Sequence, residues 1–212
     1  NGAKVTAQYA KFSGNTAGSD GGAICIKNGS LEANNTVFTG NTAGISGGAI
    51  YLENNSCSAK LVDCEVTDNT ATGQGGAVYC GIGSQLNGEE ITVSGNNAAG
   101  AAVYLNGAMA TLDGAVITGN VNSVDGASAL HIANGSTAQL KDSTITGNKS
   151  PNRTEYCGGV YIPNDRSKLT ISGHIVIDNN TVGAAGKEAK QAQEKDIVHA
   201  LLRQVHRRQS TQ

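Results

Sequence analysis

The sequence predicts an all-β solenoid, a right-handed parallel β-helix of about seven coils with a C-terminal amphipathic α-helix. A hydrophobic residue followed three places later by asparagine recurs, from Phe12 and Asn15 to Ile177 and Asn180. A run of small residues and a short apolar segment follow most of these pairs, as in residues 47–52. Such a period, about 20–50 residues, is typical of stacked repeats. The composition of 29 Gly, 2 Phe and no Trp suits the thin core that coils bury against one another.

The recurring asparagines are predicted to form a structural ladder at one corner of the helix. They are Asn15, Asn41, Asn69, Asn96, Asn120, Asn148 and Asn180. Successive members lie 24 to 32 residues apart. Asparagine tolerates the tight backbone of a corner, and stacked amides can pass hydrogen bonds from coil to coil. The Ser or Thr two places earlier in the first six coils is expected to form a hydroxyl ladder beside it.

Three short strands are expected in each coil. The first leads into the asparagine, as in residues 140–148, where Leu140 and Ile145 face inward. The second is the glycine-led segment 47–52, whose alternation places Ile50 and Leu52 inside and Tyr51 outside. The third surrounds a recurring leucine, at Leu61, Leu86, Leu112, Leu140 and Leu169. Because parallel crossovers are right-handed in nearly all sheets, we expect a right-handed coil. A leucine-rich repeat shares the period, but its L-x-x-L-x-L pattern is missing.

One outward column is the candidate ligand-binding site. It follows the small-residue run and comprises Tyr51, Tyr79, Tyr104, His131 and Tyr161, with Cys25 at its start. Stacked rungs would space these side chains by about 5 Å. The column could stack against sugar rings and bind a glycan. Alternatively, its rings pack on one another and stabilise the sheet.

Charge and cysteine usage argue against several classes of function. Residues 1–182 carry 9 Lys/Arg and 14 Asp/Glu, a net −5, whereas residues 183–212 carry 6 and 3, a net +3. No basic stripe suited to nucleic acid follows from this pattern, and no apolar run is long enough for a membrane span. The five cysteines show no metal-ligand spacing, so we expect no metal and no cofactor. Cys64 and Cys80 are expected to be buried thiols, and a Cys57–Cys64 disulfide remains open.

The composition changes at residue 183, which divides the chain into repeats at 1–182 and a C-terminal segment at 183–212. This segment loses glycine and places Ile197, Leu201 and Val205 on one face at helical spacing. One interpretation is a helix that caps the last coil, where open strand edges need covering. A partner-binding helix and an appended tail are the alternatives.

The paired motifs resemble a known repeat family. Phe12-x-x-Asn15 with 21–24 (Gly-Gly-Ala-Ile), and Phe38-x-x-Asn41 with 47–50 (Gly-Gly-Ala-Ile), are similar to the repeats of chlamydial polymorphic membrane protein passengers and related bacterial and protist surface proteins. Later coils keep the asparagine but replace the phenylalanine, and the glycine pair decays from Gly100 onward. The similarity spans about residues 4–182. It implies a right-handed parallel β-helix, an adhesive role and a secreted or cell-surface location.

We therefore expect a non-catalytic extracellular adhesin or structural spacer, with glycans or another surface protein as partner. No catalytic residue is assigned, because the acidic residues are scattered and the histidines isolated. The main alternative is a polysaccharide lyase or hydrolase, which needs convergent carboxylates or a calcium site. An ice-binding solenoid is a weaker alternative, since only residues 92–94 and 144–146 approach a Thr-x-Thr row.

Overall fold

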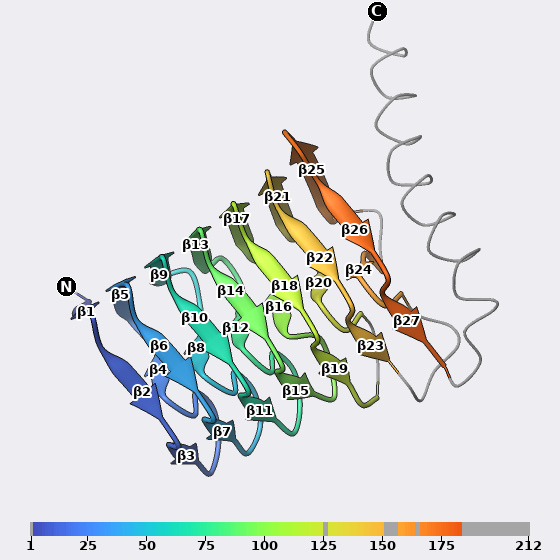
Figure 1. Ribbon diagram of the computed structural model, residues 1–212. Helices are drawn as coiled ribbons and strands as arrows, with labels where there is room; N and C mark the ends of the chain where they lie inside the picture. Colours follow the sequence, from blue (N-terminus) through green and yellow to red (C-terminus); the bar gives the residue numbers. More distant parts are fainter. Residues whose placement is uncertain (1, 125–126, 151–156, 164–165, 184–212) are drawn as a thin grey trace, which may run out of the picture.

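The computed structural model describes residues 2–124, 127–150, 157–163 and 166–183. These residues form a parallel β-solenoid, in which each turn lies directly over the one before (Figure 1). Three of its sheets have seven strands and the fourth has six, so the described residues complete about six turns. The all-β solenoid is confirmed, with slightly fewer complete turns than the seven coils predicted. The right-handed sense of the coil stays a prediction.

Sheets A and B carry the first two strands of each turn. Sheet A consists of β1 (Ala3–Gln8), β5 (Gly29–Asn34), β9 (Cys57–Val62), β13 (Gln85–Glu89), β17 (Met109–Asp113), β21 (Thr137–Lys141) and β25 (Lys168–Ser172). Sheet B consists of β2 (Lys11–Ser13), β6 (Val37–Thr39), β10 (Glu65–Thr67), β14 (Thr92–Ser94), β18 (Val116–Thr118), β22 (Thr144–Thr146) and β26 (Val176–Asp178). Each strand pairs in parallel with its equivalent one turn away, so equivalent residues form columns along the solenoid.

Sheets C and D complete the turn. Sheet C consists of β3 (Thr16–Ala17), β7 (Thr42–Ala43), β11 (Thr70–Ala71), β15 (Asn97–Ala98), β19 (Val121–Asn122), β23 (Lys149–Ser150) and β27 (Thr181–Val182). Sheet D consists of β4 (Ile24–Ile26), β8 (Ile50–Leu52), β12 (Val78–Cys80), β16 (Val103–Asn106), β20 (Leu130–Ala133) and β24 (Val160–Tyr161).

Each full turn therefore has four strands, and the expectation of three was wrong. The segment expected as one strand over 140–148 is divided between β21 and β22, because Asp142 adopts a positive φ of 47° and turns the chain. The additional strands of sheet C follow the asparagines and are only two residues long. A strand this short shows no alternation, so a period of two could not reveal it.

Most inward side chains form one apolar core, and the alanines of sheet C form a small second cluster. Phe38, Val66, Val93, Ile117 and Ile145 of sheet B are fully buried in a single column. Phe12 stacks on Phe38 at the start of this column, with ring centroids 4.9 Å apart and 6° between planes. Each turn thus buries its aliphatic side chains against the turns on either side, which explains how a chain so poor in aromatic residues sustains a core.

The asparagine ladder is confirmed along its whole length. The side-chain Nδ2 of each asparagine from Asn15 to Asn148 donates to Oδ1 of the next one, at 2.8 to 3.0 Å. The same Oδ1 also accepts the backbone N–H of the preceding asparagine. From Asn41 onward, Nδ2 donates in addition to a backbone carbonyl of the previous turn, for example Phe38 O from Asn69. The buried amides therefore find their hydrogen-bond partners in the equivalent residues and backbone of the neighbouring turns.

The neighbouring hydroxyl column is less regular than the ladder. Thr67 Oγ1 donates to Thr39 Oγ1 at 3.1 Å, and Thr146 Oγ1 donates to the carboxylate of Asp178 at 2.6 Å. The predicted C-terminal helix, over 183–212, lies outside the described residues from position 184 onward. Of the part of the chain that the structure describes, none is helical.

Candidate functional site

Two outward surfaces carry the side chains that could contact a ligand: the aromatic column of sheet D and the outer face of sheet A. The aromatic column is Cys25, Tyr51, Tyr79, Tyr104, His131 and Tyr161. The parallel register of sheet D places these six residues opposite one another, as the sequence predicts. Whether they bind a ligand stays a prediction.

The rings of the aromatic column pack on one another. Tyr51 and Tyr79 stack with centroids 5.0 Å apart and 10° between planes, and Tyr79 and Tyr104 with centroids 5.7 Å apart and 5° between planes. His131 is tilted against Tyr104 at 4.5 Å and meets Tyr161 edge-on at 4.9 Å. Both faces of Tyr79 are thus covered, so the column presents ring edges and hydroxyls to the outside. A sugar could reach those groups but could not lie flat on the middle rings.

Hydrogen bonds tie the column to the following turn of chain. Asn106 Nδ2 donates to the hydroxyl oxygen of Tyr79 at 2.8 Å, and Asn134 Nδ2 donates to Asn106 Oδ1 at 2.6 Å. Burial, with the carboxylate of Asp20 nearby, raises the pKa of Tyr51 to about 12, and burial raises the pKa of Tyr104. Both hydroxyls are therefore neutral at physiological pH and can donate hydrogen bonds.

His131 differs from the tyrosines around it. Its side chain is only 8% exposed, and its Nδ1 has no hydrogen-bond partner among the described residues. Burial lowers the pKa of His131 to about 4, so the ring is neutral near pH 7. Three further buried oxygens, Gln74 Oε1, Ser128 Oγ and Ser150 Oγ, also lack partners in the described part of the chain. All of these groups except Gln74 Oε1 lie in the later turns.

The outer face of sheet A is broad, polar and partly charged. Its outward residues form three columns, beginning at Lys4, Thr6 and Gln8. Lys4 pairs with Glu32 and Lys141 with Asp113, each at 2.9 Å. These pairs lie on the surface and contribute little stability.

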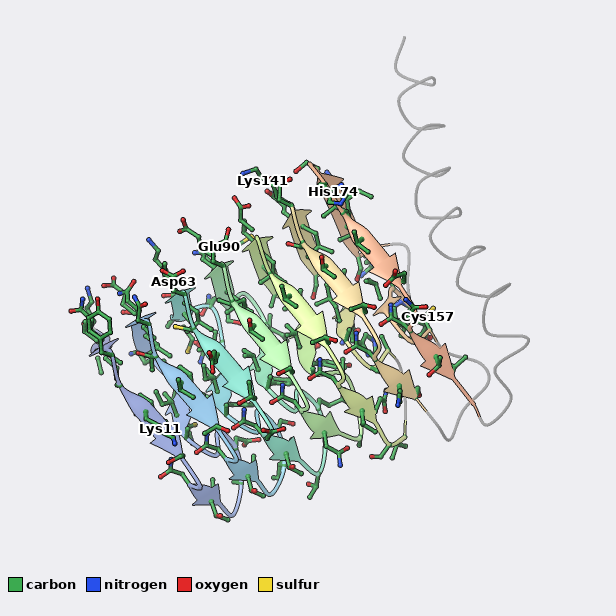
Figure 2. All side chains as sticks on the ribbon, viewed as in Figure 1. Lys11, Asp63, Glu90, Lys141, Cys157 and His174 are labelled. Atoms are coloured by element: carbon green, nitrogen blue, oxygen red, sulfur yellow. The ribbon has the colours of Figure 1, made fainter. Side chains whose placement is uncertain are left out.

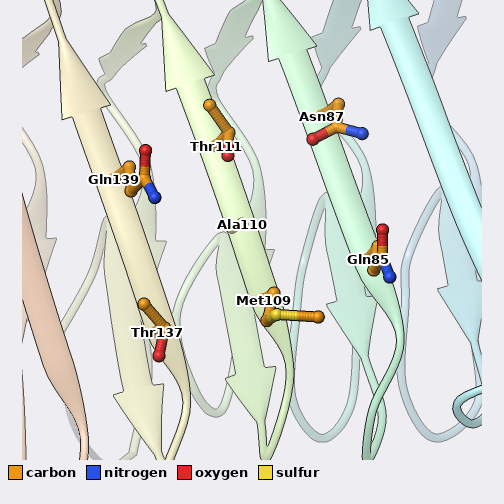
Figure 3. A pocket seen from close by; sticks show the side chains of 7 residues that line it. All are labelled: Gln85, Asn87, Met109, Ala110, Thr111, Thr137 and Gln139. Carbon is orange, nitrogen blue, oxygen red and sulfur yellow. The ribbon is translucent and has the colours of Figure 1, made fainter.

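A shallow hollow lies in the middle of this face (Figure 3). It is lined on β13 by Gln85 and Asn87, on β17 by Met109, Ala110 and Thr111, and on β21 by Thr137 and Gln139. Sequence reasoning missed it, because each residue alone resembles an ordinary solvent-facing side chain. The sequence pattern that could have indicated the hollow is the alternation of mostly polar residues in β13, β17 and β21, three equivalent strands of successive turns.

Acidic residues follow a turn between sheets A and B. Asp63, Glu90 and Asp142 occupy the same corner with φ of 49°, 52° and 47°, and Figure 2 shows Asp63 and Glu90 along one edge of the solenoid. Asp142 Oδ1 accepts the backbone N–H of His174 at 2.7 Å. Within the described ranges, no group of three His, Cys, Asp or Glu side chains is placed to hold a metal ion.

Cys25, Cys57, Cys64 and Cys80 are free thiols. Cys64 and Cys80 are buried, as predicted, and burial raises the pKa of Cys80 to about 12. Cys57 and Cys64 do not form a disulfide. Instead, Cys57 Sγ donates to Ile26 O at 3.1 Å, and Cys64 Sγ donates to Val62 O at 3.2 Å. Cys25 is exposed at the start of the aromatic column.

Among the described residues, no helix has the length and apolar character needed to cross a membrane.

Comparison with known families gives one match. The sequence model of the Chlamydia polymorphic membrane protein (Chlamydia_PMP) repeat matches three times, at residues 10–27, 35–53 and 63–81. The resemblance drawn from the motifs is therefore confirmed, and the repeats it concerns are the first three of the solenoid. A comparison with curated protein sequences found no match.

Proposed function

We propose that this chain is a non-catalytic, surface-exposed β-helix that serves as an adhesin or rigid spacer and contacts a glycan or another surface protein with its side faces. The three matched repeats support a surface-exposed β-helix at the outer surface of a cell. The adhesive or spacing role goes beyond that match and rests on the physical character of the solenoid.

The observation that carries the proposal is the unbroken ladder. Six successive amide links join the turns from Asn15 to Asn180. Strand pairing in all four sheets runs parallel to the same axis. A segment held together in this way keeps its length and presents the same faces to every partner, which is what a spacer or an adhesive surface requires.

The non-catalytic part of the proposal is supported by three carboxylates that other groups engage, although the register also places Glu89 beside Asp113. Asp113 pairs with Lys141, Glu32 pairs with Lys4, and Asp142 accepts a backbone N–H. A glycoside hydrolase would need two carboxylates about 5–10 Å apart across a substrate. The alternative enzyme function is tested by incubating the chain with acidic and neutral polysaccharides and assaying new reducing or unsaturated ends. Any turnover above a buffer control would overturn the proposal.

The adhesive function is tested by binding to arrays of glycans and extracellular proteins. The variant Tyr79→Ser/Tyr104→Ser removes the middle of the aromatic column. The matched control is Tyr9→Asn, because Tyr9 lies outside the column, is 76% exposed, and occupies the corner position that Asn35 holds in the next turn. We expect the wild type and the control to bind a common partner.

The outcomes separate the two roles. Binding lost only in the double variant makes the aromatic column the adhesive surface. Binding retained in every variant places the adhesive surface elsewhere on the solenoid. An absence of binding on both arrays rules out the adhesin and leaves the spacer.

A further inference from the structure

We propose that the hollow on sheet A is a binding site for a neutral saccharide, separate from the aromatic column. The proposal rests on the surface exposure in the proposed function and names a ligand class for one face. Its side chains come from β13, β17 and β21, three adjacent central strands of the seven-stranded sheet.

The geometry of the hollow suits a small ring. It encloses about 140 Å³, and the register aligns Gln85, Met109 and Thr137 in one row and Asn87, Thr111 and Gln139 in the next. Figure 3 shows the Met109 side chain extending toward Gln85, with Thr111 between Asn87 and Gln139. Rungs of a sheet repeat about every 4.8 Å, which is comparable to the length of one sugar unit.

The hydrogen-bonding groups of the hollow are unused. The side-chain amides of Gln85, Asn87 and Gln139 form no hydrogen bond with any described residue, although all three lie within two rungs of one another. By contrast, the side-chain amides of the buried asparagine ladder and of the pair Asn106 and Asn134 are hydrogen-bonded to one another. Each free amide offers two donors and an acceptor, and the two threonines add hydroxyls that can do both.

The chemistry of the lining selects among ligand classes. A peptide that adds a strand needs an open sheet edge, but β13, β17 and β21 are each paired on both sides. An anionic ligand needs convergent Arg or Lys side chains, and none lines the hollow. These two observations favour a neutral ligand that binds through side chains.

A saccharide meets both conditions. Its hydroxyls donate and accept in the same way as the amides and threonines. Met109, which is 50% exposed, supplies a polarizable apolar contact for the C–H face of a sugar ring.

The test uses the full chain and an array of neutral oligosaccharides built from glucose, galactose and mannose, with sialylated and sulfated oligosaccharides as the charged arm. The variant is Asn87→Ala/Gln139→Ala. The matched control is Thr6→Ala/Gln8→Ala, which removes exposed polar groups from β1 of the same face. We expect the wild type and the control to bind a neutral oligosaccharide, and the Asn87→Ala/Gln139→Ala variant to bind it at least tenfold more weakly. Circular dichroism should show all three equally folded.

The Tyr79→Ser/Tyr104→Ser variant distinguishes this site from the aromatic column. Retained binding in that variant supports the hollow, and lost binding assigns the sugar to the column. The proposal of the hollow is overturned if no neutral oligosaccharide binds, if only charged ones bind, or if the hollow variant binds as tightly as wild type. Since a protein partner on the extracellular protein array would still show an adhesin, failure here is distinguishable from failure of the proposed function.

Discussion

The first three turns and the later ones share the asparagine ladder but differ at the corner before sheet D. Gly21, Gly47 and Gly75 open this corner in the first three turns with φ of 67°, 69° and 68°. These glycines lie within the three matched repeats. In the fourth turn Gly100 no longer has a positive φ, and in the fifth the corner contains Ala127. The Gly-Gly-Ala motif of the first three turns thus coincides with one particular backbone conformation at this corner.

One turn later, a second boundary separates two kinds of interior beside sheet C. Its inward column is Ala43, Ala71 and Ala98 in the second to fourth turns, and these form a small apolar cluster. The column continues with Asn122 and Ser150, both buried. On the outside, Tyr104 is followed by the buried His131. The later turns therefore hold polar groups where the earlier ones hold alanine or tyrosine.

This comparison indicates which positions of a turn tolerate substitution. A ladder asparagine contacts both neighbouring turns, so its loss would leave groups unpaired in each. A corner contacts fewer groups and can change length without breaking strand pairing. We expect the ladder to dominate stability and the corner, histidine and serine substitutions to have smaller, local effects.

The largest effect is expected from Asn96→Ala. It removes the acceptor for both Asn69 Nδ2 and the Asn69 backbone N–H, which remain buried. The free energy of unfolding should fall by roughly 2–5 kcal/mol, since each buried donor left unpaired costs about 1–3 kcal/mol. Chemical denaturation measures this. Asn87→Ala, at an exposed amide, should change stability little; equal losses in both variants would refute the ladder.

Next is the pH dependence that His131 imposes. Its pKa is lowered to about 4 in the folded chain, whereas the unfolded chain binds a proton near pH 6.5. Stability should be highest above pH 6.5 and fall as the pH drops toward 4, by up to about 3 kcal/mol. The variant His131→Tyr restores the residue type of Tyr104 and should flatten the profile between pH 7 and 5. An unchanged slope would show that His131 is not responsible.

Gly48→Ala is expected to cost less. A β-carbon at Gly48 would collide with the carbonyl oxygen of Gly76 and lie 2.8 Å from the backbone of Thr70. Overpacking of this kind typically costs about 1–3 kcal/mol. The fourth turn already has Ala101 at the equivalent position, so Ala101→Gly is the matched comparison. Thermal unfolding should show a clear loss for Gly48→Ala; equal stability would mean that the early corner yields as readily as the later one.

Ser150→Ala is expected to have the smallest effect and the opposite sign. The Ser150 hydroxyl is buried without a partner among the described residues, in the column that holds alanine in earlier turns. Its removal should raise stability by roughly 1 kcal/mol or less. Ser143→Ala is the control, because Ser143 Oγ accepts the Ala115 N–H and donates to Lys141 O. That variant should lose stability, and a loss in Ser150→Ala as well would imply a hidden partner.

The sequence predicted a column of aligned side chains wherever one residue type recurs at the same position of successive repeats. The asparagine ladder, the inward Ile50 and Leu52, and the aligned aromatic residues all follow from such recurrence. Sheet C was not predictable, because strands such as β7 are two residues of Thr and Ala. The ring stacking that covers Tyr79 depends on side-chain rotamers, which no pattern of letters specifies.

The hollow on sheet A escaped prediction for a different reason. Gln85, Met109 and Thr137 lie in one row, but successive turns differ in length, so sequence spacing alone does not reveal this alignment. It becomes visible only from the register of three strands. The left-handed corner at Asp63, Glu90 and Asp142 also escaped prediction. These residues share a positive φ, but no sequence motif accompanies it.

The asparagine ladder also gives the solenoid an electrical polarity. Each amide carbonyl from Asn41 to Asn180 points toward the preceding turn, because its Oδ1 accepts from that side. Strand dipoles in most sheets largely cancel, whereas these amide dipoles add along the axis, as peptide dipoles do in an α-helix. The column therefore carries a partial negative charge at the Asn15 end and a partial positive charge at the Asn180 end.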